Sequence, residues 1–263
     1  MSGAPTADGG HLLSLDLWHT LVYLEPGAEE RYMREQVDLA CAVLAEARAV
    51  PGRAPSPRSE LRPVFEAVYA GAVAASQQGR SVTPAAQIVE AGRRTGRRPS
   101  ADRYVEQLAE LVRGTDFRRA PHAVEVLREL RDDGWRTALV SNTVGEPGAS
   151  LRPMLERMGF AELLEVLVFS DELPWTKPAP EIFLRAAERS GVAPGRTVHV
   201  GDGWVDIEGA RRAGLRAGVL YTGLQHYGQR YRELFLPRGW AEPATPYRVQ
   251  SWPELPELLA SLG

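Results

Sequence analysis

The stretch His11-Leu-Leu-Ser-Leu-Asp-Leu-Trp-His-Thr-Leu21 decides the fold of this chain. Its apolar run follows a glycine-rich segment and is short and continuous, which is typical of a strand buried inside a parallel sheet. The strand should end near Asp16. A carboxylate placed after Leu-Leu-Ser-Leu is costly to bury unless it is paired or binds a cation, so Asp16 is a candidate functional residue from the outset.

The sequence pattern changes to helical segments after this strand, from about Glu29 to Thr115. Breakers separate these segments, and no convincing strand lies among them. The predicted helices span Glu30 to Ala49, Ser59 to Gln78, Pro84 to Gly96 and Ala101 to Arg113. Loops rich in Pro, Gly or Arg join them. Residues 25–115 are therefore predicted to form an inserted, all-helical domain.

Strands and helices alternate in the remainder of the chain. Strands are expected at Trp135 to Val140, Val166 to Phe169, Thr197 to Val200 and Ala217 to Tyr221, and helices at Pro121 to Asp133, Ala149 to Met158, Pro180 to Ser190 and Val205 to Ala213. A helix at Gln225 to Phe235, a short strand at Tyr247 to Gln250 and a helix from Pro253 are predicted to complete the pattern. The order predicts an α/β fold with a Rossmann-like, doubly wound parallel sheet, formed by residues 1–24 and 116–263.

Composition excludes several classes of protein. The 263 residues are 44% hydrophobic and 25% charged, as in ordinary globular proteins. A net charge of -3 gives no overall field for nucleic acid or an anionic membrane, so neither is expected as a partner. The N-terminal residues lack signal-peptide features and no stretch approaches a membrane span, which predicts a cytoplasmic protein. Cys41 is the only cysteine, which excludes an internal disulfide.

Polar side chains follow the carboxyl ends of the predicted strands, where ligands bind in open parallel sheets. They are Asp16 and Thr20, Ser141 and Asn142, Lys177, and Asp202 with Asp206. Taken singly, Asp206 could be a helix cap and the Ser141 segment a turn. Together they match phosphoryl transfer, which needs a carboxylate nucleophile, a hydroxyl, a cation and oxygen ligands for Mg²⁺. Lys177 is also the only lysine, as if a compact ammonium were required there.

Four motifs resemble those of the haloacid dehalogenase superfamily and occur in the family's order. They are Leu15-Asp-Leu-Trp-His-Thr-Leu21, Leu139-Val-Ser-Asn142, Lys177-Pro-Ala-Pro-Glu-Ile-Phe183 and Val200-Gly-Asp-Gly-Trp-Val-Asp-Ile-Glu-Gly-Ala210. They span about residues 11 to 221, and the helical insertion lies where this family places its C1 cap. The resemblance implies a hydrolase, most simply a Mg²⁺-dependent phosphatase that acts on a phosphorylated small molecule through an aspartyl-phosphate intermediate.

The resemblance also implies roles for individual residues. Asp16 would be the nucleophile, Ser141 would bind the transferred group, and Lys177 would steady both. Metal ligands would be Asp16, Asp202, the backbone carbonyl of Trp18 and, directly or through water, Asp206. The substrate would be bound by Thr20, Asn142, Trp18 and His19.

Trp18 departs from the family pattern, because most family phosphatases carry there a second aspartate that protonates the departing alcohol. General acid catalysis is worth about 10²–10⁴ in rate. Three alternatives follow: a phosphatase that needs no such acid or uses His19, a dehalogenase, whose halide needs no proton, or a weakened binding protein. The phosphonatase branch is excluded because the cap has no lysine to form an imine.

The cap residues carry no motif that identifies the substrate. Arg31, Tyr32 and Arg34 are candidates by position only, and Trp18 is expected to narrow the pocket. The cluster Arg93, Arg94, Arg97 and Arg98 is predicted to be a solvated basic loop. The oligomeric state is not predicted.

Overall fold

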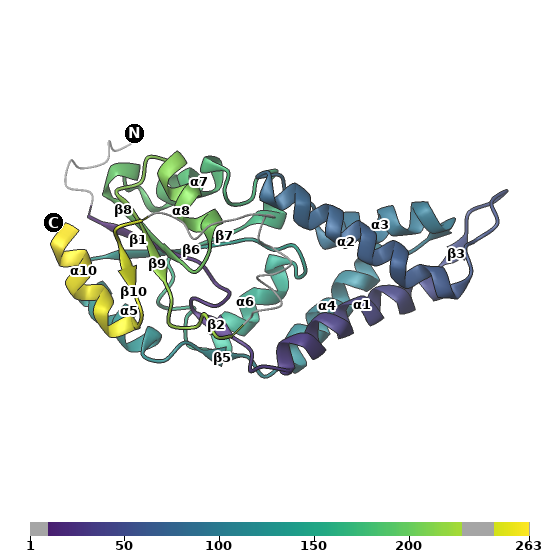
Figure 1. Ribbon diagram of the computed structural model, residues 1–263, viewed down its shortest axis with the longest axis horizontal. Coiled ribbons are helices and arrows are strands. Elements are labelled where there is room, and N and C mark those ends of the chain that lie inside the picture. Colours follow the sequence, from purple (N-terminus) through teal and green to yellow (C-terminus); the bar gives the residue numbers. More distant parts are fainter. Residues whose placement is uncertain (1–9, 228–244, 263) are drawn as a thin grey trace, which may run out of the picture.

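A computed structural model describes residues 10–227 and 245–262 of the chain. Figure 1 shows a core built around a sheet at one end and an elongated group of helices at the other. The sheet contains β1 (Leu12–Leu15), β6 (Arg136–Ser141), β7 (Val166–Phe169), β8 (Thr197–Gly201), β9 (Ala217–Tyr221) and β10 (Arg248–Val249). Its order is β10-β9-β8-β1-β6-β7, and each neighbouring pair is parallel. The predicted Rossmann-like α/β class is confirmed.

Helices cover both faces of this sheet, because both faces of its strands are apolar. On one face Leu12, Ala138 and Val140 pack against α7 (Pro180–Ser190), and α8 (Trp204–Arg212) lies beside that helix. On the other face Leu13 and Leu15 belong to a cluster with α5 (Ala123–Asp132), α6 (Gly148–Arg157) and α10 (Leu255–Leu262). Short 3-10 turns lie at Arg58–Glu60, Ser170–Glu172, Pro194–Arg196 and Trp252–Glu254.

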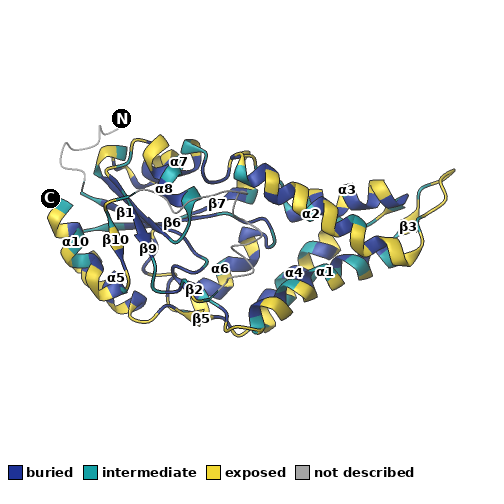
Figure 2. Cartoon of the chain, viewed as in Figure 1, coloured by how far each residue is buried: buried dark blue, intermediate teal, exposed yellow. Residues whose placement is uncertain are grey.

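Four helices make up the cap: α1 (Ala28–Glu46), α2 (Leu61–Gln77), α3 (Pro84–Thr95) and α4 (Ala101–Gly114). They enclose a separate apolar cluster that includes Leu44, Phe65, Ile88 and Leu108, as the buried stripes in Figure 2 indicate. Local signals set their ends. The Thr83 hydroxyl accepts a hydrogen bond from the Ala86 N–H (3.1 Å) at the start of α3, and Gly96 ends that helix with φ 67°. The domain limits at residues 25 and 115 remain predictions.

Two short ladders were not predicted, and the first corrects the expectation that the helical block lacks strands. β3 (Arg48–Ala49) pairs with β4 (Arg97–Arg98) at the far tip of the cap. β2 (Val22–Tyr23) pairs with β5 (Arg118–Arg119) where the chain leaves and re-enters the core. Pairs of two residues are too short to produce a periodic sequence pattern, and their partners are distant in the sequence.

The cap also contacts the core through the connection between α2 and α3. The Thr176 N–H donates to the Gly79 carbonyl (3.1 Å), and the Ser81 N–H donates to the Pro174 carbonyl (3.1 Å). The Ser81 hydroxyl donates to the carbonyl of Ser170 (2.6 Å). The cap is therefore attached at its two chain connections and docked at a third point, beside the loop that carries Lys177.

The C-terminal predictions are only partly testable. The strand expected at residues 247–250 is observed as β10, and the closing helix as α10. The helix expected at residues 225–235 lies largely outside the described residues, and its described part, 225–227, is a turn. Among the helices that the structure describes, none has the length and apolar character needed to cross a membrane.

Candidate active site

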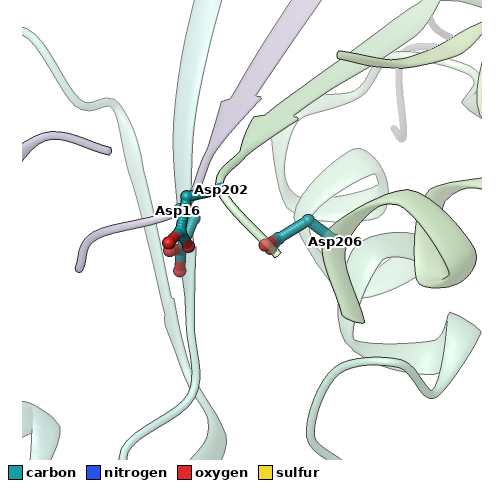
Figure 3. Close-up of side chains that lie close together, drawn as sticks. All are labelled: Asp16, Asp202 and Asp206. Carbon is teal, nitrogen blue, oxygen red and sulfur yellow. The ribbon is translucent and has the colours of Figure 1, made fainter. Parts of the chain in front are cut away.

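Three neighbouring strands bring the predicted residues together at one edge of the sheet. Asp16 directly follows β1, Ser141 is the last residue of β6, and Asp202 directly follows β8. Since β8, β1 and β6 are adjacent and parallel, their carboxyl ends meet. Asp206, in the first turn of α8, points toward the same place (Figure 3). Asp16, Asp202 and Asp206 each offer a carboxylate oxygen within 4.8 Å of the others.

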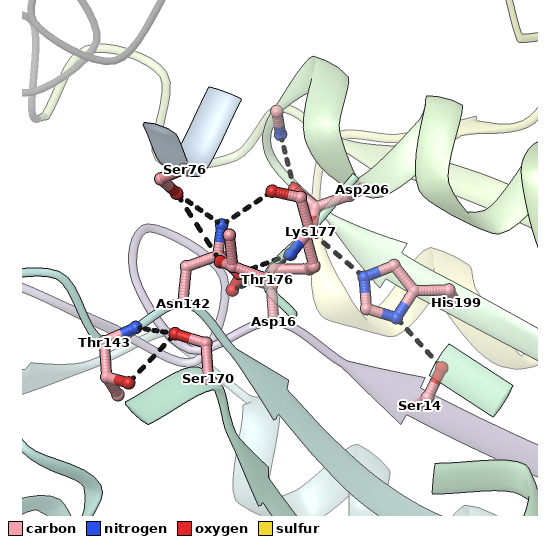
Figure 4. Close-up of polar contacts among 11 residues, drawn as sticks. Ser14, Asp16, Ser76, Asn142, Thr143, Ser170, Thr176, Lys177, His199 and Asp206 are labelled. Atoms are coloured by element: carbon pink, nitrogen blue, oxygen red, sulfur yellow. Dashed lines mark hydrogen bonds and ion pairs between the residues drawn. The ribbon is translucent and has the colours of Figure 1, made fainter. Parts of the chain in front are cut away.

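Lys177 is the cation of this site. Its Nζ donates hydrogen bonds to Oδ1 of Asp16 and, at 2.7 Å, to Oδ1 of Asp206 (Figure 4). The side chain is 2% exposed, so both interactions are shielded from water. Burial alone would lower the pKa of Lys177, but the carboxylates of Asp16 and Asp206 outweigh it and raise that pKa. The lysine therefore stays protonated.

Negative charge exceeds positive charge in this cluster, because one ammonium faces three carboxylates. Burial, together with the nearby carboxylates of Asp206 and Asp202, raises the pKa of Asp16 to about 7, although Lys177 opposes the shift. A divalent cation would offset this excess charge, and carboxylate oxygens are the ligands that Mg²⁺ prefers. The donor set of Asp16, Asp202 and Asp206 thus fits a hard divalent cation.

Asp206 is held by a buried polar relay that the sequence motifs do not include. Its Oδ1 lies 3.0 Å from Nε2 of His199, and Nδ1 of His199 lies 2.9 Å from the Ser14 hydroxyl. Its Oδ2 accepts from the Gly203 N–H (3.0 Å), so the simpler prediction of a helix-start cap is also fulfilled. Any Cβ at Gly201 would meet the Asp206 carboxyl at 2.2 Å, which explains a glycine there. The sequence did contain a signal for this relay: Ser14 and His199 are polar residues inside two otherwise apolar strands, and the two residues are paired across β1 and β8.

Both oxygens of Asp206 therefore already have protein partners. Burial would raise the pKa of this carboxyl, but Lys177 and His199 together hold it below its usual range. Asp206 is an ionised anchor for Lys177 and for the turn that carries Asp202.

Asn142 shapes the loop of Lys177. Its Oδ1 accepts from the Lys177 N–H (2.8 Å), and its Nδ2 donates to the Lys177 carbonyl (3.1 Å) and more weakly to the Ser76 hydroxyl of the cap (3.5 Å). Ser76 also lies 3.5 Å from the Thr176 hydroxyl (Figure 4). The predicted substrate contact of Asn142 stays a prediction; the contacts observed hold the backbone of Lys177.

Two buried hydroxyls of the predicted set have no hydrogen-bond partner among the described residues. They are Oγ of Ser141 and Oγ1 of Thr20, in residues that are both 0% exposed. Burying a hydroxyl without a hydrogen-bond partner costs free energy, so a bound ligand that supplies the partner would remove this cost. Ser141 ends the strand next to Asp16, where a phosphoryl oxygen would accept its hydrogen bond. The Thr20 carbonyl accepts from the Trp252 indole N–H (3.2 Å), which fixes that turn.

Trp18 and His19 face the junction between core and cap. The Trp18 ring packs on Phe117 of the returning connection, with centroids 5.3 Å apart. His19 adopts φ 56°, and its Nε2 lies 3.2 Å from a carboxylate oxygen of Glu29 at the start of α1. Trp18 therefore packs against the connection that returns from the cap, and His19 links the turn after Asp16 to the first cap helix.

A cavity of 30 Å³ lies at this junction and contains residues that the sequence reasoning missed. Glu146, five residues after Ser141, is buried there, and its Oε1 accepts from Nε2 of Gln36 (2.7 Å). Burial raises the pKa of Glu146. No motif covers Gln36 or Glu146, so only the packing of α1 against the loop after β6 reveals them.

The other candidates from the cap do not lie together. Tyr32 lines this cavity, whereas Arg34 lines an adjoining hollow and lies 3.8 Å from Glu30. Arg31 lies outside both of these spaces. The prediction of a basic loop is wrong in its structure: Arg93 and Arg94 lie in the last turn of α3 and pair with Glu90, and Arg97 and Arg98 form strand β4. This region lies at the far tip of the cap, away from the carboxylates.

Comparisons with known proteins agree with these motifs. Residues 12–214 match the family model of haloacid dehalogenase-like hydrolases. The chain is 35% identical over 128 residues to a phosphoglycolate phosphatase of Shigella boydii (49% of this chain, 48% of that protein). It is 34% identical over 125 residues to an N-acetylmuramic acid 6-phosphate phosphatase of Pseudomonas aeruginosa (48% and 52%). The chain thus matches about half the length of these curated relatives.

Solved structures show the same fold. A phosphatase from Thermococcus onnurineus superposes with TM-score 0.60 and 20% identity, covering 95% of this chain and 97% of that one. A 2-haloacid dehalogenase from Pseudomonas syringae superposes with TM-score 0.57 and 21% identity, covering 97% and 100%. At these identities the likeness concerns architecture and leaves the reaction open.

Proposed function

Because the chain belongs to the haloacid dehalogenase-like hydrolase family, we propose that it is a magnesium-dependent phosphatase acting on a phosphorylated small molecule. The observation that carries this proposal is the cluster of Asp16, Asp202 and Asp206, whose carboxylate oxygens lie within 4.8 Å of one another. The buried ammonium of Lys177 contacts two of these carboxylates, those of Asp16 and Asp206. A phosphoryl group with a divalent cation matches the charges and donors of this cluster.

Asp16 is assigned as the nucleophile. One of its oxygens attacks phosphorus, the bond from phosphorus to the leaving-group oxygen breaks, and the leaving group departs with the electron pair and takes a proton from solvent. Water then attacks phosphorus and gives up a proton to solvent, the bond between phosphorus and the Asp16 oxygen breaks, and phosphate and the carboxylate are released. Lys177 orients Asp16 through its hydrogen bond and offsets the charge on the phosphoryl oxygens. Ser141 donates to one of those oxygens, which gives its buried hydroxyl the partner that it lacks among the described residues.

The metal would be held by Asp16, Asp202 and the Trp18 carbonyl, with Asp206 contributing through water because both its oxygens have protein partners. When bound, Mg²⁺ would supply charge neutralisation, so that the anionic nucleophile and the anionic phosphoryl group can approach. This is the role that the excess of carboxylates over ammonium groups in the cluster requires.

A dehalogenase remains the second candidate, and Trp18 is the observation that favours it. A halide leaves without a proton, so a nonacidic residue at this position suits that reaction. The three clustered carboxylates favour the phosphatase, because without a metal ion their negative charges would repel one another and remain uncompensated. The relatives named as phosphatases support the same choice.

The test measures phosphate release from p-nitrophenyl phosphate and acetyl phosphate, alongside halide release from 2-chloropropionate. We expect Mg²⁺-dependent phosphate release, stopped by EDTA and restored by added Mg²⁺. Asp16→Asn should abolish turnover while leaving the circular dichroism spectrum unchanged, whereas the exposed Asp133→Asn should keep full activity. Halide release that persists in EDTA, or full activity of Asp16→Asn, would refute the phosphatase.

A further inference from the structure

The residues that line the cavity at the junction of core and cap indicate what kind of leaving group can bind there. Two core loops flank it: the turn after Asp16 contributes Trp18 and His19, and the loop after Ser141 contributes Val144, Gly145 and Glu146. Helices α1 and α2 cover the opposite side with Tyr32, Met33, Gln36 and Tyr69. The cavity is therefore bounded by the two loops that follow Asp16 and Ser141, the residues assigned to the phosphoryl group. We call the residues Trp18, Tyr32, Met33, Gln36, Tyr69 and Glu146 the leaving-group subsite.

The polar groups of this subsite suit a neutral ligand. Glu146 is buried and accepts from Gln36, and burial raises its pKa, so its surroundings already disfavour negative charge and a second anion beside it would be costly. The Tyr32 hydroxyl is buried beside Glu146, and burial first, followed by that carboxyl, raises the pKa of Tyr32 well above its ordinary value, so the hydroxyl keeps its proton. The Tyr32 hydroxyl can therefore donate a hydrogen bond to a ligand oxygen, and the Glu146 carboxyl can accept one from a ligand hydroxyl.

The charges around the subsite disfavour an anion. Of the described residues that line the cavity, none is Arg or Lys, and two are glutamates. The carboxylate of Glu29 lies 3.2 Å from Nε2 of His19. In the adjoining hollow, which shares Met33, Gln36 and Tyr69, the arginines already face carboxylates: Arg34 faces Glu30, and Arg62 contacts Asp38. A carboxylate on the substrate would be desolvated beside Glu146 with no cation to compensate it.

We infer that the leaving group of the substrate is uncharged and bears a hydroxyl or similar hydrogen-bonding oxygen, and that this subsite selects against phosphate esters whose leaving group carries a carboxylate. The inference rests on the proposed phosphatase function. The ring of Trp18 and the half-buried ring of Tyr69 offer apolar surface for carbon atoms, while Tyr32 and Glu146 offer the hydrogen bonds.

A matched pair of substrates tests this selection. 2-Hydroxyethyl phosphate and 2-phosphoglycolate have nearly the same size and differ in a terminal hydroxymethyl against a carboxylate. We expect kcat/KM for 2-hydroxyethyl phosphate to exceed that for 2-phosphoglycolate by about tenfold or more, which is the size of effect expected when a charge is desolvated without a partner. Equal values, or a preference for 2-phosphoglycolate, would overturn the inference.

A variant separates the subsite from other causes of the preference. Met33→Lys places a cation in the subsite on a half-buried position, where the long side chain keeps its ammonium near water. We expect it to lower the ratio of the two kcat/KM values by about tenfold. Met158→Lys makes the same change at a half-buried methionine of the core outside the cavity, and its ratio should equal that of the unaltered chain.

The outcomes distinguish this inference from the proposed function. p-Nitrophenyl phosphate, with an uncharged leaving group, reports on the core chemistry in every variant. If it is hydrolysed with Mg²⁺ but Met33→Lys does not change the ratio, the subsite assignment is wrong while the phosphatase stands. If no phosphate ester is hydrolysed, the proposed function fails, and the inference that rests on it fails as well.

Discussion

Lys177→Met is the substitution whose effect on stability can be worked out most directly from the structure. The side chain is 2% exposed and its ammonium contacts Asp16 and Asp206, whose side chains are 9% and 1% exposed. Methionine fills a similar volume, so the loss is mainly electrostatic. Breaking a buried ion pair by removing one partner costs about 3–5 kcal/mol, because the remaining charges are buried without compensation. We expect a decrease of this size in the free energy of unfolding.

Urea denaturation followed by circular dichroism, in EDTA so that no metal replaces the missing ammonium, measures this decrease. With an m value near 3 kcal/mol/M, the midpoint should fall by about 1–1.7 M. Arg185→Met is the matched control: its guanidinium lies 2.7 Å from Glu188, but these side chains are 40% and 68% exposed. Surface pairs contribute at most about 1 kcal/mol. If Lys177→Met costs no more than this control, the buried cluster does not depend on Lys177.

Three further predictions concern the substrate side of the site. Trp18→Asp should raise hydrolysis of alkyl phosphates relative to acetyl phosphate by about 10–100-fold in single-turnover assays, since it supplies a general acid; an unchanged ratio would mean that another residue already donates the proton. Ser141→Ala should lower kcat/KM for p-nitrophenyl phosphate by about 10²–10³ if its hydroxyl binds the transferred group, and an effect below threefold would contradict that role. Glu146→Gln should be more stable than the unaltered chain at pH 8, and the difference should shrink toward pH 5. Burial raises the pKa of Glu146 in the folded state. The stability that Glu146 contributes is therefore lost as the pH rises from its unfolded pKa of about 4.3 through its folded pKa. Urea midpoints at both pH values test this, and a difference that grows at low pH would have the wrong sign.

The local sequence pattern was sufficient for the core and for its principal polar residues. Continuous apolar runs predicted the buried strands, and helical periodicity predicted the insertion. Because the carboxyl ends of parallel strands share an edge, the order of elements already implied that Asp16, Ser141 and Asp202 would meet. The physical reason is that the apolar runs, the helical periodicity and the polar residues at strand ends are each set by residues that are close together in the sequence.

Other features depend on contacts between segments that are distant in sequence, and only the tertiary structure decided them. The relay from Ser14 through His199 to Asp206 requires the register of β1 against β8. The pairing of β3 with β4 joins residues about fifty positions apart and leaves no periodic signal. The leaving-group subsite exists only because α1 and α2 pack over the loop after β6, which brings Gln36 to Glu146 across 110 residues of sequence and buries a carboxyl that would otherwise be solvated. Burial and charge pairing at that distance depend on which surfaces pack together, and no single stretch of the sequence specifies this.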